Sequence, residues 1–333
     1  MIISVHADYW LLGMPTANDA ITRPGSTFVR ILIEQLTVVG PNIFILISGY
    51  FGIRPKFKSF SNLIFQILFF FAGTYIIGLA TDLVSFSMQS FLRIFLLSHG
   101  DWFIKAYIAL YIIAPILNSY VEKTSKFELG STVILIYTFT FLFGLSGAVG
   151  WIQQGYSLFS FIGLYLIARY IRTYSSDSHN IKWSGIFLTV VLCATCCAYF
   201  GCRYSLNFIP GLMVSYINPL VIIGSVSLFM AFRNASIPQS HFINRVSRST
   251  FAVYLFPCFF VFDFIYRHLI MNVYEQFDGI FVIVIITGIL MATFFAAVLI
   301  DQFRIMIWNR IYPSLERAYN TIRIKIKIRY ESN

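Results

Sequence analysis

Apolar residues occur in long runs along this chain, and short segments between the runs hold most of its charges. A run of about 20 apolar residues matches the roughly 30 Å of hydrocarbon in a bilayer. Such a run must be helical, because backbone N–H and C=O groups find no water in lipid. The pattern predicts nine full spans, over residues 36–52, 60–80, 102–121, 129–149, 155–172, 183–202, 212–232, 250–270 and 279–300.

The N-terminal segment 1–7 is also apolar, and it looks like the end of a further span whose beginning is missing. It lacks the basic start and the cleavage site of a signal peptide. With this truncated first helix included, the predicted fold is an all-α integral membrane protein, a polytopic bundle of about ten transmembrane helices.

Proline and glycine mark two expected interruptions of helix. Pro24 and Gly25 favour turns within the segment 8–35, which is predicted to lie outside the membrane. Pro41 and Asn42 interrupt the next span, where they free backbone groups that a cavity or a neighbouring helix must satisfy.

Basic residues are distributed unevenly between the two sets of loops. Of the 24 lysines and arginines, 18 lie in alternate loops and in the segment after the last span. The positive-inside rule places these loops in the cytoplasm, together with both termini. We therefore expect a transmembrane domain over residues 1–303 and a basic cytoplasmic tail over residues 304–333.

Composition agrees with the membrane interpretation. Hydrophobic residues make up 58% of the chain and charged residues 11%, and the mean hydropathy is +0.76. A soluble domain usually carries about 25% charged residues. The net charge of +10 follows from the loop bias and is expected to face the anionic inner leaflet of the bilayer rather than nucleic acid. The five cysteines have no histidine at zinc-ligand spacing, so no metal site is predicted.

Ionisable residues within spans are costly and usually mark a pathway, a relay or an ion pair. His6 is the first candidate, because it ends the first span and its imidazole titrates near neutral pH. Asp8 follows closely and is expected to orient the ring, although an interfacial histidine facing headgroups is the plainer alternative. Arg30 and Glu34 are four residues apart, the spacing at which helical side chains pair.

Five blocks of the sequence, in order, resemble the acyltransferase-3 family of integral-membrane O-acyltransferases, in the branch found with bacterial surface-polysaccharide genes. Together they cover most of residues 1–270. The blocks are IISVHADYW, VGPNIFILISGYFGIRPKFKS, DWFIKAYIALYIIAPILN, QQGYSLFSFIGLYLIARYI and INRVSRSTFAVYLF.

This resemblance implies a multi-pass acyltransferase of the bacterial inner membrane. Such proteins take an acyl group, commonly acetyl, from acyl-CoA on the cytoplasmic side and deliver it to a hydroxyl of a cell-surface or lipid-linked glycan. Acetyl-CoA is then a donor substrate and not a permanently bound cofactor. His6 matches the family's essential histidine, a candidate general base or transient acyl carrier, because imidazole can accept the proton of an attacking hydroxyl.

The resemblance also suggests binding residues. Arg54, Lys56 and Lys58 fall where the family carries basic residues on its cytoplasmic face, and they are expected to hold the phosphates of CoA. Membrane-proximal lysines and arginines also occur without such a role, as do belts of interfacial aromatic residues. The residues expected to line the substrate cavity are Asp8, Ser48, Tyr50, Trp102, Tyr107 and Tyr111.

One departure from the family pattern leaves alternatives open. The family usually has an arginine about ten residues before the histidine, and this chain has only five residues there. A regulatory membrane protein without activity is consistent with that difference. A glycan flippase or a polysaccharide polymerase also has many spans. A flippase would have charged residues lining a central cavity, and the deep spans contain few charges. A polymerase would have a large outer loop with several arginines, and the segment 8–35 contains only Arg23 and Arg30.

Overall fold

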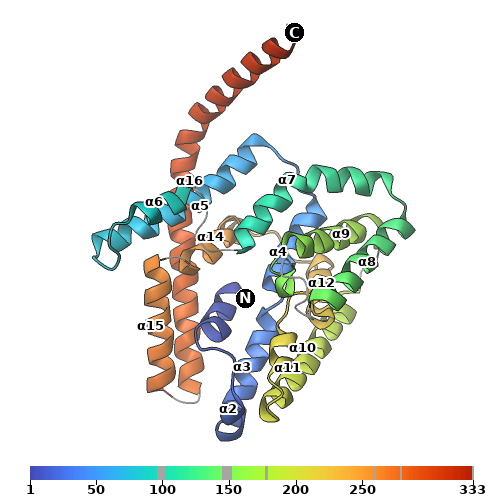
Figure 1. Ribbon diagram of the computed structural model, residues 1–333, viewed down its shortest axis with the longest axis vertical. Coiled ribbons are helices and arrows are strands. Elements are labelled where there is room, and N and C mark those ends of the chain that lie inside the picture. Colours follow the sequence, from blue (N-terminus) through green and yellow to red (C-terminus); the bar gives the residue numbers. More distant parts are fainter. Residues whose placement is uncertain (96–101, 145–151, 177–178, 259, 278–279, 332–333) are drawn as a thin grey trace. The chain divides into compact units, whose positions relative to one another are not determined.

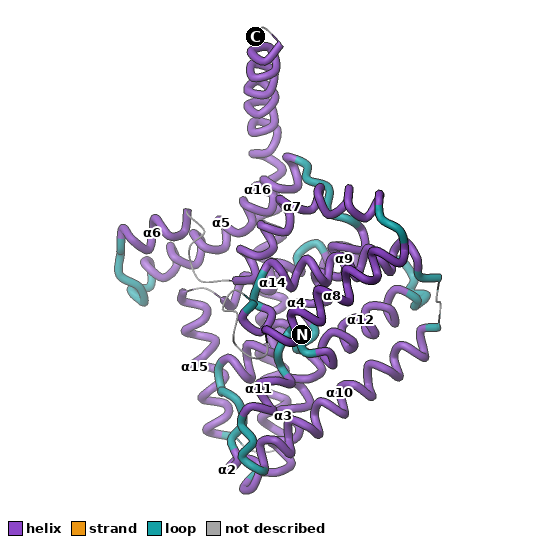
Figure 2. Tube along the Cα trace, turned by 45° about the vertical axis from the view of Figure 1, so that its right-hand side comes forward, coloured by secondary structure: helices purple, strands orange, loops and turns teal. Residues whose placement is uncertain are grey.

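The computed structural model describes residues 1–95, 102–144, 152–176, 179–258, 260–277 and 280–331 (Figure 1). Every regular element in these ranges is a helix (Figure 2). The chain forms two compact units. The first consists of Met1–Pro55, Gly100–Pro238 and Leu269–Val282, and the second of Lys56–His99, Gln239–His268 and Ile283–Asn333.

Six described helices are long and apolar enough to cross a membrane. The α-helical membrane fold is thereby confirmed, and the number of about ten spans stays a prediction. A further apolar helix, α12 (Pro219–Arg233), is shorter. The six are Pro24–Phe51, Phe57–Ala80, Trp102–Lys123, Lys126–Gly144, Ile181–Arg203 and Phe281–Ile324.

The expectation of turns at Pro24 and Gly25 is wrong. Helix α3 (Pro24–Thr37) begins at that proline and leads into α4 (Gly40–Phe51), so the helical segment starts well before residue 36. Proline suits the first position of a helix, because its missing N–H would have no intrahelical partner there.

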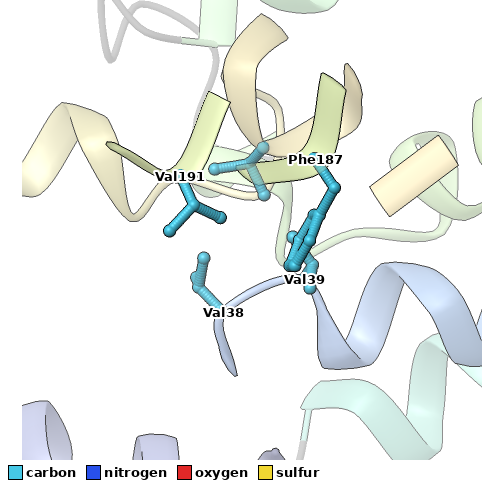
Figure 3. Packing of buried hydrophobic residues seen from close by; sticks show 5 residues of the cluster. Val38, Val39, Phe187 and Val191 are labelled. Carbon is cyan, nitrogen blue, oxygen red and sulfur yellow. The ribbon is translucent and has the colours of Figure 1, made fainter. Parts of the chain in front are cut away.

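The first unit is a helical bundle in which α4 packs against α9 (Leu158–Tyr174), and α10 (Asn180–Arg203) packs against α3 and α12. Figure 3 shows one of its apolar contacts, where Val38 and Val39 of the α3–α4 junction meet Phe187 and Val191 of α10. The bundle is completed by α1 (Ile2–Val5), α2 (Ala17–Thr22), α7 (Trp102–Lys123), α8 (Lys126–Gly144) and α11 (Phe208–Met213).

The second unit contains a buried polar group between two of its helices, α5 (Phe57–Ala80) and α16 (Ile280–Glu331). Asp301 accepts hydrogen bonds from Arg304 Nε at 2.8 Å and from Gln66 Nε2 at 2.9 Å. Helix α16 continues without a break past residue 304, where the basic tail was expected to begin. The unit also contains α6 (Met88–Phe95), α13 (His241–Ser247) and α14 (Thr250–Leu255), and α15 (Phe260–Gln276) is divided between the two units after His268.

The crossing of α4 and α9 depends on Gly49. A Cβ atom at this position would lie 2.8 Å from Ala168 Cβ and 2.9 Å from the backbone oxygen of Tyr165. Gly49→Ala is therefore expected to lower the melting temperature of the detergent-purified protein, with a loss of about 1–3 kcal/mol from overpacking. Gly73→Ala is the matched control, because nothing lies within 4 Å of a Cβ atom there. Equal melting temperatures for the two variants would show that the helices do not cross so closely.

Candidate active site

His6 lies in a short π-helical turn, His6–Trp10, that continues α1. Insertions of this kind are rare in helices and are frequent at functional sites. Both α1 and the turn pack against α3. Gly40 makes room for the start of the chain, since a Cβ atom there would lie 3.2 Å from Ile2 Cγ1. The segment that carries His6 is thus held against the α3–α4 junction.

An ion pair fastens this turn to α3. Arg30 Nε donates to Asp8 Oδ1 at 2.8 Å, and Arg30 Nη2 donates to the same oxygen and, at 2.8 Å, to the backbone oxygen of Gly13. The expected pairing of Arg30 with Glu34 is therefore wrong. The arginine reaches across to the π-helical turn, so the Asp8 carboxylate, which we expected to orient the histidine, is paired with a guanidinium.

Glu34 was expected only as the ion-pair partner of Arg30, and its place in the site could not be predicted from the sequence. It is 1% exposed, and its Oε2 atom has no hydrogen-bond partner among the described residues. Its carboxylate is close enough to act electrostatically on the hydroxyls of Tyr9 and Tyr156. Two carboxylates, those of Glu34 and Asp8, thus lie near the single guanidinium of Arg30. A buried carboxylate without full hydrogen bonding is costly and is usually retained for function.

Three aromatic rings form a cluster in the same unit. The Trp102 ring centroid lies 4.7 Å from that of Tyr156 and 5.6 Å from that of Tyr216, and the two tyrosine rings are 5.3 Å apart. Gly155 allows this approach, because it has φ +102° and a Cβ atom there would lie 2.7 Å from Tyr216 Cβ. Tyr156 belongs to this aromatic cluster (Trp102, Tyr156, Tyr216) and lies within electrostatic range of Glu34.

Other residues expected to line the cavity lie along α4 and α7. Ser48 Oγ and Tyr107 Oη are 3.3 Å apart and share a hydrogen bond. The Tyr107 ring stacks on Phe103, which in turn contacts Trp102. Tyr111 is buried one turn further along α7. The structure thus brings Ser48, Tyr107 and Trp102 into one connected group, and their role as cavity lining stays a prediction.

Tyr50 lies apart from that group, at the end of α4. Its hydroxyl accepts hydrogen bonds from Arg172 Nη1 at 3.1 Å and Arg233 Nε at 3.3 Å. The sequence identified these two arginines only as markers of the cytoplasmic side. Their association with Tyr50 could not be inferred from the sequence, because they come from other helices, α9 and α12.

The three basic residues expected to hold CoA are divided between the units. Arg54 is exposed in the first unit, just after α4. Lys56 and Lys58 belong to the second unit, where Lys58 Nζ lies 4.9 Å from the ring centroid of Tyr312. Their role in phosphate binding stays a prediction.

A family model described as an acyltransferase domain matches residues 1–301, nearly the whole chain. The chain belongs to the acyltransferase-3 family. The match includes the His6 turn and both helices, α3 and α4, against which that turn is held. This acyltransferase is a membrane protein with multiple apolar helices. No curated protein and no solved structure matches the chain.

Proposed function

We propose that this acyltransferase moves an acyl group, most simply acetyl, from acyl-CoA at the cytoplasmic face of a bacterial inner membrane to a hydroxyl of a cell-surface or lipid-linked glycan. The observation that carries the proposal is the position of His6. It lies in a π-helical turn that an ion pair, Asp8–Arg30, fastens to α3, the helix that also carries the buried Glu34.

The chemistry requires a group that accepts a proton. A sugar hydroxyl is a weak nucleophile near neutral pH, and an imidazole such as that of His6 removes its proton as the oxygen attacks the thioester carbon. The new ester bond forms, the C–S bond breaks, and the CoA thiolate leaves and takes up the proton. If His6 acts instead as a transient acyl carrier, the acyl group passes from sulfur to the imidazole and then to the hydroxyl.

The two ends of helix α4 suggest how the acyl-CoA donor is oriented. Gly40 contacts the segment that carries His6, and Tyr50 lies at the other end of the helix, among arginines. The two positions are about 15 Å apart at about 1.5 Å per residue. A long donor with its charged end near Tyr50 then presents its thioester toward His6. Trp102 and the other rings of the aromatic cluster offer faces suited to a sugar between these ends.

The proposal is tested in a deletion strain by proton NMR of the surface polysaccharide. Loss of O-acyl signals with the polymer still present at its normal length is the expected result, and a plasmid copy of the gene should restore them. A polymer that is absent or shortened would contradict acyl transfer, because a flippase or a polymerase acts on the polymer itself. An unchanged O-acyl content would contradict it equally.

A further inference from the structure

Two arginines from different helices converge on one phenol. Arg172 of α9 and Arg233 of α12 both donate to the Tyr50 hydroxyl, at 3.1 Å and 3.3 Å. Their guanidinium carbons also lie over the Tyr50 ring, 5.0 Å and 5.8 Å from its centroid. Two positive charges are thus concentrated around one neutral side chain that both contact.

A third arginine adjoins this pair. Arg169 is one turn before Arg172 on α9, and a Cβ atom at Gly52 would lie 3.0 Å from Arg169 Nη1. Gly52 therefore provides the space for this guanidinium, and its φ of +75° is one that other residues rarely adopt. Arg169 Nε is buried and has no hydrogen-bond partner among the residues that the structure describes.

The surrounding backbone is held in place. The Tyr165 hydroxyl donates to Asn118 Oδ1 at 2.7 Å and accepts from the backbone N–H of Ile53 at 3.0 Å. Asn118 Nδ2 in turn donates to the backbone oxygen of Ile53 at 2.9 Å. The chain just after α4 is therefore fixed to α7 and α9, so the arginine cluster (Arg169, Arg172, Arg233) adjoins a preorganised end of α4.

No described aspartate or glutamate forms an ion pair with any of these three arginines. Part of the cluster has a structural explanation, because Arg233 Nη2 donates to the backbone oxygen of Ser175 at the end of α9, at 2.9 Å. That explanation does not extend to the other two. Arg172 is exposed and bonds only to Tyr50 within the described part of the chain, and Arg169 Nε bonds to nothing there. Arg172 and Arg233, which contact the same phenol, repel one another unless an anion neutralises them.

We propose that Arg172 and Arg233, which both contact Tyr50, and Arg169, one turn before Arg172 on α9, bind phosphate groups of the acyl-CoA donor. Guanidinium groups match phosphate oxygens with paired, charge-assisted hydrogen bonds. The proposal rests on the proposed function. It places the phosphates of CoA at these three arginines instead of at Arg54, Lys56 and Lys58, the residues that the sequence suggested. Phospholipid headgroups carry the same chemistry and are the alternative occupant.

The test measures binding of radiolabelled CoA to the protein purified in a maltoside detergent, which contains no phosphate. Arg172→Gln and Arg169→Gln are each expected to raise the Kd for CoA about tenfold, because each removes a charge-assisted hydrogen bond to a phosphate. Pantetheine, which lacks the phosphates, should bind wild type and variants equally. Arg172 is exposed, so its substitution leaves the fold intact, and Arg248→Gln is the control at another exposed arginine.

Two outcomes would overturn the assignment. One is that wild type and both variants bind CoA equally well and are equally stabilised against heat by short-chain phosphatidylglycerol. The other is that CoA affinity is again equal but the variants lose the stabilisation by phosphatidylglycerol, which would assign the cluster to lipid. If the wild type itself fails to bind CoA, the donor named in the proposed function is wrong as well. The binding experiment therefore distinguishes a wrong assignment of the arginine cluster from a wrong choice of acyl-CoA as the donor.

Discussion

Replacement of His6 by alanine is expected to lower acyl transfer by about 10²–10⁴-fold, the usual contribution of a positioned general acid–base group. The residue lies at the start of the π-helical turn that continues α1 and packs against α3, so the substitution removes the imidazole without removing the Asp8–Arg30 pair that holds the turn. In a deletion strain complemented with the variant, the O-acyl signals of the polysaccharide should fall to the level of the deletion.

The matched control for this experiment is His241→Ala. His241 is exposed at the start of α13 and belongs to the other unit, so its loss should leave O-acylation unchanged. Protein amounts are compared by immunoblot. Restoration of O-acylation by His6→Ala to the wild-type level, at equal protein amounts, would remove His6 from the chemistry.

Replacement of Arg30 by methionine is expected to destabilise the folded protein by about 3–5 kcal/mol, the range seen when one partner of a buried ion pair is removed. The change leaves Asp8 and Glu34 as neighbouring buried carboxylates without a cation. It also removes the hydrogen bond to Gly13 and the contact with the ring of Tyr274, whose centroid is 5.3 Å from the guanidinium carbon.

Melting of the detergent-solubilised protein, followed by size-exclusion chromatography with fluorescence detection, measures this effect. The double variant Arg30→Met/Asp8→Asn should recover part of the loss, because it removes the carboxylate that Arg30 had paired with. Arg248→Met, at an exposed position, should melt with the wild type. If Arg30→Met also melts with the wild type, the ion pair does not hold the His6 turn.

The helices were largely predictable from the sequence because long apolar runs have one stable structure in lipid. The runs over 102–121 and 183–202 correspond closely to α7 and α10. The start of α3 was misjudged, since Pro24 can either end a helix or begin one, and the local sequence does not distinguish the two.

The site was less predictable because its decisive contacts join distant parts of the chain. Spacing along a helix paired Arg30 with Glu34, whereas Arg30 in fact bonds Asp8, 22 residues away. Tyr50 meets arginines 122 and 183 residues further along the chain. Resemblance to the family suggested His6 as the candidate catalytic residue, but it could not show that a buried carboxylate and an arginine cluster lie in the same unit.

The most direct measurement of the central claim follows a labelled acyl group. The purified protein is reconstituted in liposomes and supplied with acetyl-CoA labelled in the acetyl group, together with the glycan taken from the deletion strain. We expect label in the glycan that mild alkali releases, as for an ester, and none with His6→Ala. Label that stays in acetyl-CoA with the wild-type protein, while CoA is bound and the acceptor is present, would contradict the account.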